Sequence, residues 1–83
     1  MAKLYIYGTI GFDVEADYVR AALDEMEGEV ELRINSGGGD VFEGNAIYSL
    51  LESYKTKDGN SVTVYVDGIA ASIASVIAMA GDT

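Results

Sequence analysis

Stretches with the period of a β-strand alternate with stretches with the period of a helix, and this order limits the possible folds more than any other feature of the sequence. Residues 29–34, EVELRI, alternate strictly between charged and apolar side chains, and residues 61–66, SVTVYV, alternate valines with polar or aromatic side chains. A period of two is typical of a strand with one buried face. A shorter strand is predicted at residues 4–7, where GTIG follows as a turn.

A helical pattern follows each predicted strand. Residues 13–26 place apolar side chains one helical turn apart, and Asp13 stands where an N-cap is expected. Residues 40–54 repeat this pattern and open with DVFE, which has the spacing of a capping box. Residues 69–80, rich in Ala and Ile, predict a third helix.

The order β-α-β-α-β-α predicts a single α/β domain over residues 1–83. Strands separated by helices of this length usually pair in parallel through right-handed crossovers. The polar faces of the strands also leave open an α+β arrangement with an antiparallel edge.

Composition excludes several classes of function. The net charge is −9, so the chain should be repelled by nucleic acid and by anionic membranes. The sequence has no Cys, which excludes disulfides, a thiol nucleophile and thiolate metal sites. The most apolar segment, residues 69–80, is shorter than the ~20 residues that cross a bilayer. We expect no metal and no cofactor, and no membrane or nucleic-acid partner.

Two segments should meet at one edge of the predicted sheet. In a parallel sheet the carboxyl ends of neighbouring strands lie together, which brings Gly37–Gly39 beside the segment from Asp67 to Ser72. Both segments open helices, whose first N–H groups lack intrahelical partners. Such N–H groups stabilise the negative charge that develops on a carbonyl oxygen under attack, so the arrangement fits acyl transfer.

Simpler explanations exist for the same residues. A serine in an Ala-rich helix is usually a packing residue whose hydroxyl bonds a backbone carbonyl, and a glycine run before a helix can be an ordinary turn or a phosphate cradle. Asp40 fits a helix cap better than a metal ligand. Tyr5, Tyr7 and Tyr65 fit packing or an oligomer surface.

Two motifs together resemble the Clp-type serine peptidases, and most closely the ClpP-like head-maturation (prohead) proteases of tailed phages. INSGGGDVFEGNAIYSLL resembles the strand, glycine loop and helix of that family, and VTVYVDGIAASIASVIAMAGD resembles its nucleophile segment. IYGTIG fits the first strand of the family. The resemblance covers nearly the whole chain and implies a ClpP/crotonase-like α/β fold with a mainly parallel sheet.

The resemblance also assigns roles to residues. It implies Ser72 as the nucleophile and the N–H groups of Gly39 and Ile73 as the oxyanion hole. The substrate backbone would lie along the segment next to this hole, at Gly37, Gly38, Asp40 and Val41.

The sequence departs from the family at two points. Gly37 stands where members of the family often have Pro. No His occurs anywhere, although the family places a His and then an acidic residue well after the serine. Lys3, Lys55 and Lys57 are poor substitutes for this base. We therefore expect residues 1–83 to be the N-terminal part of a ClpP-like protease domain, incomplete at its C-terminus and inactive alone.

The resemblance implies a serine endopeptidase acting on polypeptides, for example phage capsid or scaffold proteins. It also implies a homo-oligomer in the cytoplasm or the phage procapsid, with any unfoldase partner left open. Two alternatives remain, namely a crotonase-type acyl-CoA enzyme and a non-catalytic module that assembles with itself.

Overall fold

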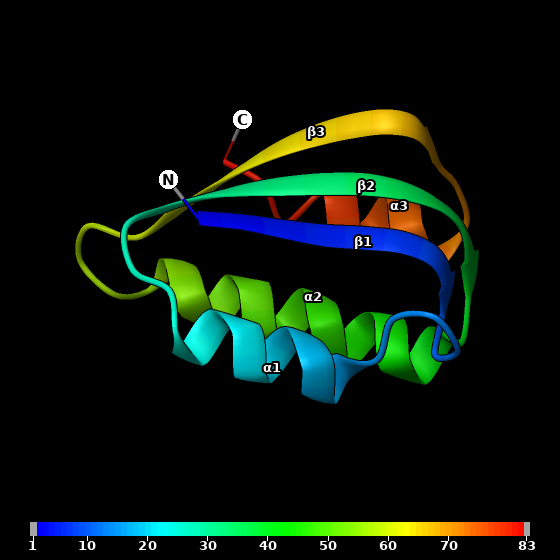
Figure 1. Ribbon diagram of the computed structural model, residues 1–83, viewed down its shortest axis with the longest axis horizontal. Coiled ribbons are helices and arrows are strands. Elements are labelled where there is room, and N and C mark those ends of the chain that lie inside the picture. The colour runs from blue at the N-terminus through cyan, green and yellow to red at the C-terminus, as the bar shows by residue number, and fades with distance from the viewer. Residues whose placement is uncertain (1, 83) are drawn as a thin grey trace.

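The computed structural model describes residues 2–82, which form three strands and three helices in strict alternation (Figure 1). The strands are β1 (Ala2–Ile10), β2 (Glu29–Gly39) and β3 (Ser61–Ala70). The helices are α1 (Ala16–Asp24), α2 (Val41–Lys55) and α3 (Ile73–Ala78). β2 pairs in parallel with β1 and with β3, in the order β1-β2-β3. The predicted α/β class is confirmed, and the alternative with an antiparallel edge is wrong for the described residues.

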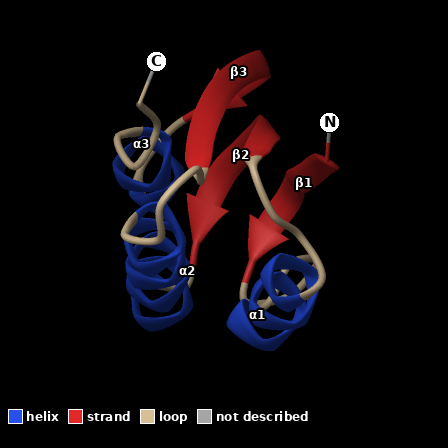
Figure 2. Ribbon diagram, turned by 90° about the vertical axis from the view of Figure 1, so that its left-hand side faces the viewer, coloured by secondary structure: helices blue, strands red, loops and turns tan. Residues whose placement is uncertain are grey.

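The helices cover one face of the sheet (Figure 2). When neighbouring parallel strands follow one another in sequence order, crossovers of the same hand place their helices on the same side. The alternating strand patterns fit this arrangement, because one set of side chains meets the helices and the other set remains accessible. The buried residues from the strands are Leu4, Ile6, Ile10, Val30, Leu32, Ile34 and Val62, and those from the helices include Val19, Leu23, Ile47, Leu51, Ala74 and Ile77.

The other face of the sheet is bare in residues 2–82 and forms an ordered row of side chains. Tyr5, Arg33 and Tyr65 are register partners across the three strands. The Arg33 guanidinium lies 4.5 Å from the centre of the Tyr65 ring, a cation–π contact. All three predicted strand tyrosines, at positions 5, 7 and 65, are exposed on this face.

The helix starts differ in part from the predictions. Asp40 is the N-cap of α2, and its side chain accepts a hydrogen bond of 2.9 Å from the Phe42 N–H, as predicted. Glu43 does not complete a capping box. Its carboxylate instead accepts from the Ala16 N–H at 2.9 Å, at the start of α1. Asp13 is not a cap either, because the turn folds its carboxylate back to the Thr9 N–H at 2.7 Å.

The glycine run is the end of β2 rather than a free loop. Gly38 and Gly39 pair with Thr9 and Ile10 of β1, so the strand runs five residues past the predicted end at Ile34. A Cβ on Gly39 would overlap the carbonyl oxygen of Ile10. Only a residue without a side chain lets the two strands approach so closely, and this contact fixes the glycine run on its β1 side.

None of the helices formed by residues 2–82 has both the length and the apolar character needed to span a membrane.

We predict that Gly44→Ala destabilises the fold, although the same change in most helices is stabilising. Gly44 is buried in α2, and a Cβ there would overlap Cγ1 of Ile73, so α2 and α3 would have to separate. Overpacking of this kind costs about 1–3 kcal/mol. Urea denaturation measures the effect, with Asn45→Ala at the neighbouring exposed position as the control. Equal stability of the two variants would contradict this packing.

Candidate active site

Ser72 has a backbone conformation that non-glycine residues rarely adopt. Its φ is 56° and its ψ is −131°, and it is the one non-glycine residue with positive φ in the described chain. Such conformations cost about 1–3 kcal/mol and persist where the surrounding structure enforces them. Ser72 occupies the N-cap position of α3, one residue before the predicted first turn, but its hydroxyl makes no capping bond. The residue is exposed.

Gly38 lies directly against Ser72. A Cβ on Gly38 would stand 2.7 Å from the Ser72 Cβ and 3.2 Å from its Oγ. Gly38 also has a φ of 113°, which side chains disfavour. The structure therefore brings the glycine run and the candidate nucleophile into contact, as the parallel pairing predicted, although the two segments are more than thirty residues apart in sequence.

Ile73 follows Ser72 and is buried against α2, where its side chain packs on Gly44. The hydrogen bonds of this turn begin with the Ala74 N–H, which donates to the Ala71 carbonyl at 3.0 Å. The Ile73 N–H thus precedes the first bond of the turn, which is the position expected of an orphan donor. The geometry is compatible with the predicted donor role of this group.

The remaining predicted site residues lie beside this contact and differ in how free their backbone is. Gly37 is exposed, and a Cβ there would meet nothing within 4 Å. Val41 is half exposed at the first position of α2. Both backbone groups of Asp40 are used within the fold, since its N–H donates to Ile10 at 2.8 Å and its carbonyl accepts from Gly44 at 2.9 Å. Asp40 therefore has no free backbone group with which to bind a peptide.

Ser36 is a site residue that the sequence reasoning missed. It is 2% exposed, and its hydroxyl accepts a hydrogen bond from the Gly38 N–H at 3.1 Å. Its carbonyl accepts from the Ala71 N–H at 3.1 Å. A serine directly before a glycine run is a signal for such a local side-chain bond to the backbone, but the pattern does not show that the serine is buried.

The segment that leads to Ser72 is also held from the bare face of the sheet. β3 has an irregularity here, because three residues, Asp67 to Ile69, stand opposite Asn35 alone. The Asn35 side chain accepts from the Ile69 N–H at 3.3 Å. The Asp67 carboxylate accepts from Arg33, with one bond of 3.1 Å from Nε, and from the Tyr7 hydroxyl. These bonds from Arg33 and Tyr7 lower the pKa of Asp67 below its ordinary value of 3.8.

A base for Ser72 is missing from residues 2–82. The sequence contains no His, and within the described residues the Ser72 hydroxyl has no hydrogen-bond partner. Lys55 lies at the far end of α2 and forms ion pairs with Glu52 and Asp82, which raise its pKa. A raised pKa makes a lysine a poorer base at neutral pH.

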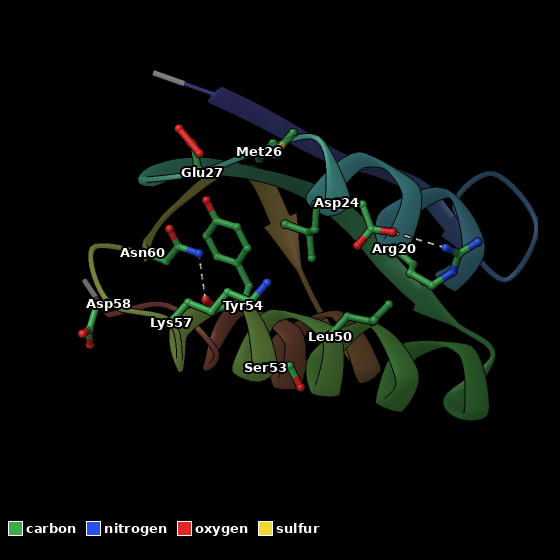
Figure 3. Close-up of a pocket in the computed structure, with 11 residues that line it drawn as sticks. Arg20, Asp24, Met26, Glu27, Leu50, Ser53, Tyr54, Lys57, Asp58 and Asn60 are labelled. Atoms are coloured by element: carbon green, nitrogen blue, oxygen red, sulfur yellow. Dashed lines mark hydrogen bonds and ion pairs between the residues drawn. The ribbon is translucent and has the colours of Figure 1, made fainter.

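A hollow of about 510 Å³ lies away from this site, between the last turns of α1 and α2 (Figure 3). Leu23, Met26, Leu50 and Tyr54 line it, together with charged side chains at its margin. The Tyr54 hydroxyl donates to the Gly28 carbonyl at 2.8 Å. The hollow adjoins the amino ends of β2 and β3, so it contains none of the predicted site residues. No group of three acidic, Cys or His side chains suited to a metal ion occurs in residues 2–82.

Comparisons with known proteins bear on the family and on the fold. The family described as "Clp protease" matches residues 6–83. ClpP1 from Listeria monocytogenes superposes with a TM-score of 0.78 and 26% identity, over 95% of this chain and 46% of that one. The ClpP protease catalytic domain from Plasmodium falciparum gives a TM-score of 0.80 and 26% identity, over 96% of this chain and 43% of that one. The chain thus spans less than half of either structure. No curated protein matches it.

We predict opposite outcomes for alanine at two neighbouring glycines. Gly38→Ala should displace Ser72, because the new Cβ has no room and the φ of 113° is strained. Gly37→Ala places its Cβ in open space and should change the free energy of unfolding by no more than about 0.5 kcal/mol. Thermal denaturation and the amide NMR shifts of Ser72 measure both effects. Equal perturbation by the two substitutions would contradict the close contact.

We predict that Asp67 makes stability depend on pH in the acid range. Its folded pKa is lowered, so its contribution is fully present above the ordinary pKa of 3.8 and is lost as pH falls through the folded value. Asp67→Asn should reduce stability at pH 7 and flatten the profile as the pH falls below about 4, which denaturation at a series of pH values measures. High salt should weaken the effect, because the groups are exposed. An unchanged acid profile in Asp67→Asn would contradict the prediction.

Proposed function

The chain belongs to the Clp protease family, and on this basis we propose that it carries the nucleophile and the oxyanion hole of a serine peptidase. One observation carries the proposal, namely an exposed serine held at a φ of 56° against a glycine run without side chains. Strain at an exposed nucleophile is typical of sites whose geometry is set for chemistry. The family match is to Clp proteases, so we carry the acyl-CoA alternative no further.

In the proposed reaction the Ser72 oxygen attacks a peptide carbonyl carbon while a base takes the hydroxyl proton. The N–H groups of Gly39 and Ile73 stabilise the charge on the carbonyl oxygen. The amine leaves with a proton, and water hydrolyses the resulting ester. Gly37 and Val41 would bind the substrate backbone by groups that β1 leaves free, whereas both backbone groups of Gly38 are already paired with the Ser36 hydroxyl.

The base in this scheme has to come from outside residues 1–83, because the sequence has no His and Lys55 is held in ion pairs. We propose accordingly that these residues are the N-terminal part of a protease domain. The solved structures, of which this chain spans 46% and 43%, support that reading.

The narrower substrate proposed here is a phage capsid or scaffold protein, cleaved in the cytoplasm or in the procapsid. Its support is the resemblance of INSGGGDVFEGNAIYSLL and GIAAS to the motifs of prohead proteases. The genes beside the parent gene test it. We expect capsid and scaffold genes beside the parent gene, and cleavage of that scaffold by the parent protein. A neighbourhood without virion genes would contradict this substrate proposal.

Self-association is proposed as well, on the exposed aromatic surface. Tyr5, Tyr7 and Tyr65 stand on the bare face of the sheet, and Phe12 and Phe42 are 84% and 86% exposed. Large exposed aromatic side chains are enriched at interfaces. Light scattering coupled to size exclusion tests this proposal, and a monomer at all concentrations would contradict it.

We predict that added imidazole lets the 83-residue chain react covalently at Ser72. Without imidazole, a fluorophosphonate should label the chain negligibly. With imidazole as an external base, labelling should be at least about tenfold faster. This acceleration is smaller than the roughly 10²–10⁴-fold that a positioned base supplies. Mass spectrometry of the peptide that contains Ser72 measures the adduct.

Ser72→Ala should abolish this labelling, and Ser53→Ala, at an exposed serine of α2, should leave it unchanged. Labelling that persists in Ser72→Ala, or that imidazole does not accelerate, would overturn the assignment.

A further inference from the structure

Ser36 is the buried polar side chain of the described core, and the proposed reaction does not use it. It lies on β2 between the row of core residues that ends with Ile34 and the glycine run. A buried hydroxyl has to be paired to offset its lost hydration. Both of its side-chain hydrogen bonds go to one residue, Gly38, two positions further along the strand.

The two bonds hold both sides of Gly38. The Gly38 N–H donates to the Ser36 oxygen at 3.1 Å, and the Ser36 hydroxyl donates to the Gly38 carbonyl at the longer distance of 3.5 Å. That carbonyl belongs to the same peptide unit as the Gly39 N–H. In a trans peptide the C=O and the N–H point in opposite directions. A hydroxyl that holds the carbonyl on the core side therefore turns the Gly39 N–H away from the core.

This peptide unit needs such a restraint because it lies between two glycines. Gly38 and Gly39 have φ values of 113° and 147°, and glycine reaches positive and negative φ with similar ease. Rotation of the unit would replace an outward N–H by an outward carbonyl oxygen, which repels a developing oxyanion. Side-chain sterics cannot oppose this rotation at two glycines, so hydrogen bonds have to do so, on one side through the parallel pairing with Ile10 of β1 and on the core side through Ser36.

The same serine also sets the position of the nucleophile segment. Its carbonyl accepts from the Ala71 N–H at 3.1 Å, one residue before Ser72, and Ser36 is the register partner of Ala70. One residue therefore fixes the glycine run through its side chain and the serine segment through its backbone. The distance between the glycine run and the serine segment therefore depends on Ser36.

We propose that Ser36 is the positioning residue of the oxyanion hole, which keeps the Gly38–Gly39 peptide unit turned so that the Gly39 N–H faces the reacting carbonyl. The proposal rests on the proposed function of Ser72 and Gly39. Its two parts, the restraint and the effect on the reaction, can be measured separately.

Amide hydrogen exchange of the 83-residue chain, followed by NMR, tests without any reaction whether the Ser36 hydroxyl holds Gly38, the residue whose carbonyl begins the Gly38–Gly39 peptide unit. Ser36→Ala should accelerate exchange of the Gly38 amide about tenfold, as expected for the loss of a buried hydrogen bond. The Leu32 amide, in the middle of β2, should exchange at its former rate. Ser53→Ala, at an exposed serine, serves as the matched control. Unchanged exchange at Gly38 in Ser36→Ala would overturn the proposal.

A peptide boronate tests the effect on the site. Its boron accepts the Ser72 oxygen, the hydroxyl proton passes to solvent, and the resulting tetrahedral anion has an oxygen that occupies the oxyanion hole. Ser36→Ala should weaken this adduct about tenfold, measured by ¹¹B NMR titration. Ser36→Cys has a similar side-chain shape but a weaker hydrogen-bonding group, so the strength of its adduct should lie between that of the unaltered chain and that of Ser36→Ala. This variant also provides a test if Ser36→Ala does not fold.

The outcomes separate the two proposals. Failure of the unaltered chain to form an adduct at Ser72 would count against the proposed function. Formation of an equally strong adduct by the unaltered chain, Ser36→Ala and Ser36→Cys would overturn the role of Ser36 alone.

Discussion

The parallel pairing of β2 with both of its neighbours is the constraint on which the candidate site depends. Pairing with β1 fixes Gly39 against Ile10, and pairing with β3 brings Ser36 opposite Ala70. Because both pairings are parallel, the glycine run and the serine segment leave the sheet at the same edge. Backbone hydrogen bonds between strands thus create a contact between residues that are far apart in sequence.

Ser72 and the glycine run enforce one another's conformation. The positive φ of Ser72 is unfavourable for a residue with a Cβ, and it is retained where the neighbouring chain leaves no alternative. Gly38 leaves space for the Ser72 side chain. Ile73, the residue that follows Ser72, packs against Gly44. A glycine is required on each side of this contact, at position 38 of β2 and at position 44 of α2. Ile73 is buried, whereas the Ser72 hydroxyl makes no capping hydrogen bond.

Sequence patterns predicted the order of the elements and the meeting of the two segments, because these follow from side-chain periodicity and from the geometry of parallel sheets. They did not predict that β2 continues through Gly39, since glycine has low strand propensity and only the close approach of Ile10 shows why the pairing persists. The capping-box pattern was misleading for Glu43, whose partner, Ala16, lies on another helix. Periodicity describes one element at a time, so contacts between elements stay hidden from it.

The segment that leads to Ser72 is held from both faces of the sheet by interactions of different physical character. On the core side Ser36 acts through hydrogen bonds shielded from water, which salt and pH scarcely affect. On the bare face Asp67 acts through exposed charges that acid and salt weaken. In the proposed arrangement the orientation of the Gly38–Gly39 peptide unit depends on the first set and on the pairing with β1, and not on the exposed charges. In the proposed reaction, stabilisation of negative charge by the Gly39 N–H would therefore depend on residues 36 to 39 and their neighbours, independently of where the base for Ser72 originates.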